Sequence, residues 1–211
     1  MRFNAQRLKF LIVGFTCILC EVILNSCGTS IHPQPTTWAE EMSLVQIRAR
    51  EHNPEAVLLR GSGEDDSIYN ANVTPKNYID MMWTFVLPDA TTFTVSTRHK
   101  DGFSTILNPY QGSVGTITPE EMKMLATSAS NVHIAPQEAL EIANPQGRLL
   151  LDQTNELISV VIGLRLYNQN QDQQATYPLW TVYYVTKSHS ERLVRIDAMT
   201  GEITNIEDRQ L

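Results

Sequence analysis

The chain has very few cysteines, and their positions are uneven. All three lie within the first 27 residues, and the 184 residues after Cys27 contain none. The part that follows Cys27 therefore has neither a disulfide framework nor thiol chemistry. Its stability must come from a hydrophobic core, which a chain of this length can build without covalent cross-links.

Motifs for catalysis and for metal binding are also missing. The five histidines are scattered, and none stands at ligand spacing from another histidine or a carboxylate. The sequence has no HExxH, EF-hand or cysteine-based metal motif, and no GxSxG or SxxK nucleophile motif. We therefore expect a protein that is not an enzyme and uses no cofactor or metal. An enzyme whose site is assembled from dispersed residues remains the alternative.

Basic residues are scarce. The whole chain has a net charge of −7. Removing residues 1–26 takes away Arg2, Arg7, Lys9 and Glu21, which leaves 13 basic against 22 acidic residues, a net charge of −9. An acidic surface repels nucleic acid and anionic lipid headgroups, so the sequence predicts no nucleic-acid partner.

No apolar run is long enough for an ordinary membrane-spanning helix. The stretch Phe10–Cys20 has 11 uncharged residues and is followed by Glu21, whereas a spanning helix needs about 20 apolar residues. A basic start and a short apolar core are typical of a secretory signal. We therefore predict a signal peptide over residues 1–26.

The end of this signal resembles a bacterial lipobox. Leu24, Ser26 and Cys27 occupy the expected positions, while Asn25 departs from the small residue usually found there. The resemblance implies that Cys27 is acylated, for example with palmitate, and anchors the protein to a membrane of the bacterial cell envelope on its extracytoplasmic side. The alternatives are an uncleaved signal anchor and an ordinary cleaved signal. Residues 27–36 are predicted to be the lipidated cysteine and a short tether.

Helix caps and alternating patterns indicate an α+β fold. Thr37 and Thr118 each begin a capping-box pattern, and a third helix is expected from Pro136 to Asn144-Pro145. Polar residues 61–67 are predicted to form a loop. Strands are predicted over residues 56–59, 82–87, 91–97, 103–107, 157–167, 179–186, 192–197 and 202–206.

The two halves of this pattern resemble each other. Each contains a helix, a Trp-Thr strand (Trp83 and Trp180), a second strand and a glycine turn. We therefore predict two tandem helix-on-antiparallel-sheet units, over residues 37–117 and 118–211. Two unrelated antiparallel meanders would look alike at this level, so the duplication is one of two interpretations.

The second half resembles a PepSY-type domain over roughly residues 132–207. The similarity lies in the helical segment 134–143, the strand 179–185 and the run Asp197-Ala-Met-Thr-Gly-Glu-Ile203. It implies a helix packed on one face of an antiparallel sheet, in an envelope protein that binds, and sometimes restrains, peptidases and has no catalytic residues of its own. The first half is a divergent version that lacks the Asp-Ala-x-Thr-Gly run.

Within the matched run, a structural role for Asp197, Thr200 and Gly201 is favoured. We expect Gly201 to adopt a positive φ in the turn, and the two polar side chains to bind nearby backbone amides.

Aromatic residues on one strand are the candidates for binding a partner. Trp180 and Tyr184 alternate with Tyr183, so the two sets point to opposite faces of the strand. One set must pack under a helix, and the other could present rigid aromatic anchors at a surface. Packing between the two halves is the alternative.

These observations lead to a functional hypothesis. The chain is expected to be a lipid-anchored, non-catalytic module that binds a protein or peptide. A structural or assembly subunit of an envelope membrane complex is the second possibility, and an enzyme is the third.

Overall fold

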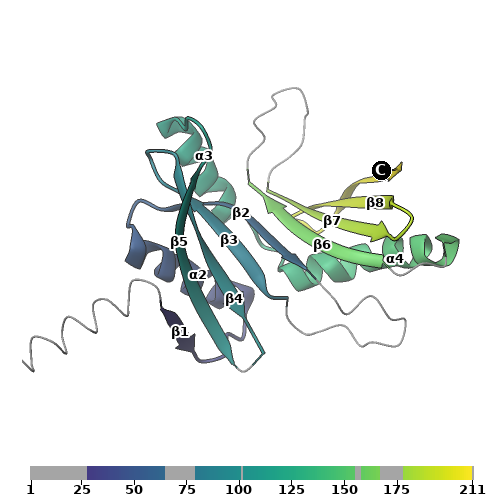
Figure 1. Cartoon of the computed structure of the whole chain (residues 1–211), viewed down its shortest axis with the longest axis horizontal. Coiled ribbons are helices and arrows are strands. Elements are labelled where there is room, and N and C mark those ends of the chain that lie inside the picture. Colours follow the sequence, from purple (N-terminus) through teal and green to yellow (C-terminus); the bar gives the residue numbers. More distant parts are fainter. Residues whose placement is uncertain (1–27, 65–78, 101, 155–157, 167–177, 211) are drawn as a thin grey trace, which may run out of the picture.

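One antiparallel sheet organises the molecule. The computed structural model describes residues 28–64, 79–100, 102–154, 158–166 and 178–210 (Figure 1). Nine strands in this part of the chain form a single sheet with the order β1-β5-β4-β3-β2-β6-β7-β8-β9. The strands are β1 (Thr29–His32), β2 (Val57–Glu64), β3 (Met81–Val86), β4 (Thr91–Arg98), β5 (Phe103–Ser113), β6 (Ile158–Arg165), β7 (Leu179–Thr186), β8 (Ser190–Asp197) and β9 (Ile203–Gln210). The helices are α2 (Trp38–His52), α3 (Pro119–Ser130) and α4 (Pro136–Thr154).

The prediction of two tandem helix-on-sheet units is wrong. The second part of β2 pairs with β6, from Arg60 opposite Arg165 to Glu64 opposite Val161, so the strands form one continuous sheet. This pairing was missed because residues 61–64 looked like a polar loop, whereas they belong to β2.

The glycines of this segment allow an aromatic side chain to approach closely. A Cβ atom on Gly61 would collide with the six-membered ring of Trp83, whose side chain is fully buried. Similarly, a Cβ on Gly63 would collide with the sulfur of Met81. The glycines therefore make room for the core beneath a strand and do not mark a loop.

The predicted starts of the first two helices are confirmed. The hydroxyl of Thr37 accepts a hydrogen bond from the backbone N–H of Glu40 at 3.2 Å. The Glu40 carboxylate, however, binds Thr36 and not the cap residue, so this box is half formed. At α3 the box is complete, because Thr118 and Glu121 bond reciprocally.

Helix α4 extends beyond its predicted end. It continues through Pro145 to Thr154. The extension places Gly147 against the ring of Tyr184, where a Cβ would not fit, and buries Leu150. Burial of this last part against the sheet offsets the backbone hydrogen bond that Pro145 cannot make.

The core lies between the helices and one face of the sheet. Three tryptophans meet there: Trp38 of α2 lies 5.5 Å from Trp83 and 6.4 Å from Trp180, measured between ring centroids. Trp83 and Trp180 are 6.5 Å apart, so the core crosses the β2–β6 junction without interruption. Among the described residues, no helix is both long and apolar enough to cross a membrane.

Part of the predicted tether is an ordered strand. Residues Thr29–His32 form β1, which pairs with β5 at one edge of the sheet. The buried Arg48 of α2 donates from Nη2 to the carbonyl oxygen of Gly28 at 2.7 Å. Cys27 and the predicted signal peptide lie outside the described residues.

Candidate functional site

The structure separates the three aromatic residues predicted to bind a partner. Trp180 and Tyr184 are fully buried on the helix-covered face of β7, and Tyr183 is half-buried on the other face. The indole N–H of Trp180 donates to the carbonyl of Ile134 at 2.9 Å, and the Tyr184 hydroxyl donates to Asn144 Oδ1 at 3.4 Å. Trp180 and Tyr184 are thus core residues that reach no surface, and only Tyr183 of this set remains accessible.

The turn residues of the second half have the expected structural role. Gly201 has a φ of +79°, and Asp197 Oδ1 accepts from the backbone amides of Met199 and Thr200 at 2.7 and 3.2 Å. The Thr200 hydroxyl accepts from the amide of Glu202 at 3.3 Å. These bonds close the turn between β8 and β9.

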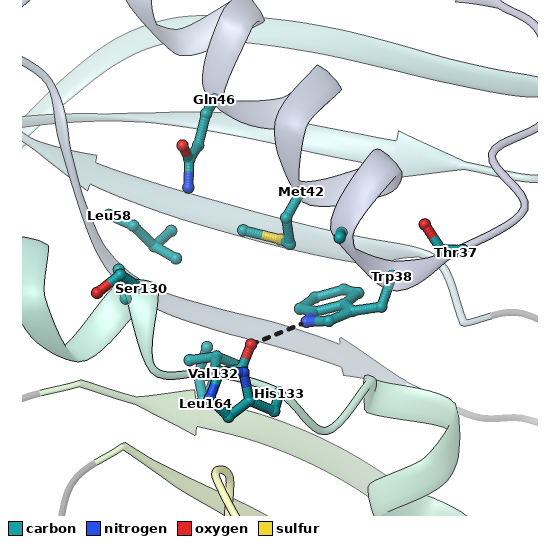
Figure 2. A pocket seen from close by; sticks show the side chains of 11 residues that line it. Thr37, Trp38, Met42, Gln46, Leu58, Ser130, Val132, His133 and Leu164 are labelled. Carbon is teal, nitrogen blue, oxygen red and sulfur yellow. Dashed lines mark hydrogen bonds between the residues drawn. The ribbon is translucent and has the colours of Figure 1, made fainter.

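A groove on the helix-covered face is the candidate site. It has a volume of about 400 Å³ and lies between α2, the connection from α3 to α4, and the sheet where β2 meets β6 (Figure 2). Its lining residues are Thr37, Trp38, Ala39, Met42, Gln46, Leu58, Ala129, Ser130, Val132, His133 and Leu164.

The groove combines an apolar floor with a polar rim. Leu58 of β2 and Leu164 of β6 are buried at its base, and Met42 reaches over them from α2 (Figure 2). Gln46 and Ser130 bring polar groups to the rim. An uncharged group with an apolar surface is therefore what this site can hold, with hydrogen bonds available at its edges.

Contacts on both sides fix the walls of the groove. The indole N–H of Trp38 donates to the carbonyl of Val132 at 3.4 Å, which links α2 to the α3–α4 connection (Figure 2). The same indole packs against Trp83 and Trp180 in the core. One wall of the site is thus formed by a side chain whose position is fixed by its neighbours.

Outside the groove lining, α2 also carries a buried carboxylate, that of Glu41. His99 Nε2 lies 3.4 Å from Glu41 Oε2, and Nδ1 lies 3.3 Å from Asp80 Oδ1. Burial alone would lower the pKa of His99, but hydrogen bonding and charge from Glu41 and Asp80 outweigh it and raise the pKa above the ordinary 6.5. The three groups hold α2 against the sheet. Among the residues that the structure describes, no three or more His, Cys, Asp or Glu side chains are arranged so that they could hold a metal ion.

The sequence did not reveal this groove. Trp38 and Met42 are four residues apart, a spacing that places them on one face of a helix but says nothing of what that face covers. The groove exists because this face overhangs the β2–β6 junction and the connection between α3 and α4. It therefore depends on a strand pairing that the sequence pattern did not show.

Comparisons with known proteins add one similar structure. No family model matches the chain, and no curated protein matches its sequence. A crystal structure from Clostridium difficile 630, described as a "putative lipoprotein", is similar with a TM-score of 0.44 and 15% sequence identity. The match covers 80% of this chain and 91% of that one. The resemblance to PepSY-type domains thus remains a prediction.

Proposed function

We propose that this protein is a lipid-anchored protein of the bacterial envelope that binds a peptide segment of a partner protein without catalysis. The observation that carries the proposal is the groove of about 400 Å³ with an apolar floor of Leu58, Leu164 and Met42. The anchor at Cys27 rests on the lipobox resemblance of the sequence.

Charge and size both favour an uncharged peptide segment as the occupant. Among the described residues that line the groove, only His133 is ionisable, although the chain after the predicted signal is strongly acidic. The volume suits one or two apolar side chains, toward the small end of the range for ligand sites. A fixed aromatic wall such as Trp38 is a favourable anchor for such a segment.

Site-specific photocrosslinking in cells can test the groove. Ala39 is exposed and lines the groove, whereas Ile47 is 50% exposed on the same helix and lies outside it. With p-benzoylphenylalanine at position 39 we expect one defined adduct, which is absent with the same residue at position 47. The substitution Gln46→Trp, which narrows the groove, should abolish the adduct at position 39.

The captured segment can then be examined directly. Mass spectrometry identifies the crosslinked peptide, and a synthetic copy is titrated against the purified protein and against its Gln46→Trp variant. Saturable binding to the first and not to the second supports the proposal. Equal adducts at positions 39 and 47, or turnover in a broad hydrolase screen with no adduct, would contradict it.

A further inference from the structure

The chain becomes part of the fold immediately after the predicted lipid attachment. The carbonyl of Gly28 accepts a hydrogen bond from the buried Arg48, and Thr29 is already paired with Ile106 of β5. No free linker therefore separates the described fold from Cys27. A lipid on Cys27 would hold the β1 edge of the sheet at the membrane surface, because an extended residue spans only about 3.5 Å.

The strands next to this edge have one face that none of the three described helices covers. Directly paired residues share a face of a sheet, so the pairings place Ile31 beside Ser104 and Arg98, and Thr29 beside Ile106, Ser96 and Met82. We call these seven residues the β1 face. Buried Phe103 and Val95 alternate with them and point to the helices.

The β1 face is apolar for a surface. Ile31 is 80% exposed and Met82 is 45% exposed, and the half-buried Ile106 lies between them in the sheet. Arg98 is its charged residue, and Arg60 and Glu64 follow further along on β2. Large exposed apolar side chains grouped in this way mark an interaction surface.

The helices on the other side of the sheet are rich in charged residues, most of which are acidic. Together α2, α3 and α4 carry eight acidic and four basic residues. The helical layer therefore has a net charge of −4, and an anionic bilayer surface would repel it. The expectation that the whole surface repels anionic headgroups does not extend to the β1 face.

We propose that the β1 face lies against the phospholipid bilayer to which Cys27 is attached, with Ile31 in the interfacial region and Arg98 near the headgroups. The proposal rests on the proposed anchor at Cys27. Two observations support this occupant: a single residue, Gly28, separates the attachment point from β1, and charge is distributed unevenly between the two faces. In this orientation the groove, on the helix-covered face, points away from the membrane and stays open to a partner.

The cysteine-free sequence after Cys27 allows a direct test by spin labelling. The acylated protein is reconstituted into vesicles of phosphatidylcholine and phosphatidylglycerol, with a nitroxide on either Ile31→Cys or Ile206→Cys. Ile206 is 43% exposed on β9, at the opposite edge of the sheet, and serves as the matched control. Acylation blocks the thiol of Cys27, so the label reacts only with the introduced cysteine.

The expected result is a change confined to one edge. Compared with the detergent-solubilised protein, the label at position 31 should lose accessibility to a water-soluble nickel complex and gain accessibility to oxygen. The label at position 206 should keep its accessibility to both. A third label on Met82→Cys should follow position 31, because it lies on the same face.

The outcomes separate this proposal from the proposed function. An unmodified Cys27 by mass spectrometry defeats the anchor, and this inference falls with it while the groove can still be tested. An acylated Cys27 with a water-exposed label at position 31 overturns only the docking of the β1 face. Protection at both edges overturns it as well, since it indicates burial by another protein.

Arg98→Glu should reduce the protection at position 31 in anionic vesicles and have less effect in purely zwitterionic ones.

Discussion

The two edges of the sheet are each held by a buried arginine, but the arginines bind different partners. At the β1 edge, Arg48 donates to the backbone carbonyl of Gly28 at 2.7 Å. At the β9 edge, Arg192 forms a bidentate salt bridge with Asp208. Its Nε donates to Oδ1 at 2.6 Å and its Nη2 donates to Oδ2 at 2.7 Å. Arg192 also donates to the carbonyl of Gln146 at 3.1 Å and so connects β9 to α4.

The two edges should respond differently to pH, because different titratable groups lie near them. A carbonyl does not titrate, whereas the carboxylate of Asp208 does, and hydrogen bonding to Arg192 lowers its pKa despite partial burial. On the β1 side, the group with a shifted pKa among the described residues is His99, whose pKa is raised. Acid should therefore weaken the β9 edge and alkali the β1 side, so one molecule contains two opposite pH dependences.

The largest effect is expected from Arg192→Met. This substitution removes the contacts of one buried guanidinium with both α4 and β9, and should lower the free energy of unfolding by about 2 kcal/mol. The cost stays below that of a fully buried ion pair because the side chain of Asp208 is 60% exposed. Urea denaturation measures it. Arg209→Met, at an exposed arginine of β9, is the control and should change stability little.

A smaller and more local effect is expected from Arg48→Met. The bond to Gly28 holds a strand of only four residues, so its loss should release β1 before the rest of the sheet. Hydrogen exchange should become about tenfold faster in residues 29–32, which corresponds to about 1.4 kcal/mol. The amides of β9 should be unaffected. A uniform increase over the whole sheet would argue against a local role, and Arg50→Met on the exposed side of α2 is the control.

The Glu41–His99–Asp80 cluster should make stability fall as pH rises. Because the pKa of His99 is raised in the folded protein, its contribution is complete below the ordinary value of 6.5 and is lost as pH rises through the raised value. His99→Gln should cost about 1 kcal/mol at pH 6, the size of one hydrogen bond, and much less at pH 9. Thermal unfolding across this range is the measurement. If plots of melting temperature against pH ran parallel for the two proteins, His99 would not titrate in this way.

The smallest effect is expected from Asp208→Asn. Its depressed pKa means that the contribution of Asp208 is present above the pKa of an unfolded aspartate and is lost as pH falls through the folded value. At pH 7 the variant should lose about 0.5 kcal/mol, since the side chain is largely exposed to water. Once the pH has fallen below the lowered pKa of Asp208, the variant and the parent should converge, and a difference that persists there would have another cause.

Local features of this fold were predictable, whereas its central pairing was not. The caps at Thr37 and Thr118 and the strand from Leu179 to Thr186 follow from short sequence signals, and the structure contains them. The β2–β6 junction joins residues about 100 positions apart, and its glycines gave a local signal for a loop. Their real cause, the space taken by Trp83 next to Gly61 and by Met81 next to Gly63, is a set of tertiary contacts that no local pattern contains.

The same reason explains the errors about possible sites. Trp180 and Tyr184 were candidates because an isolated strand has two faces and the pattern does not say which one is covered. Their contacts with Ile134 and Asn144 show the helix-covered face. The groove is formed by α2, the α3–α4 connection and both strands of the junction together. The sequence predicted several of these elements, but not that they lie next to one another.

The bond between Arg48 and Gly28 has a mechanical consequence. If Cys27 is anchored and a partner held in the groove is pulled outward, tension enters the fold at Gly28. The Arg48 contact sits at the point of loading, ahead of the hydrogen bonds between β1 and β5. This hydrogen bond would therefore bear the force before β1 separates from β5. A protein without this arginine should unfold at a lower pulling force.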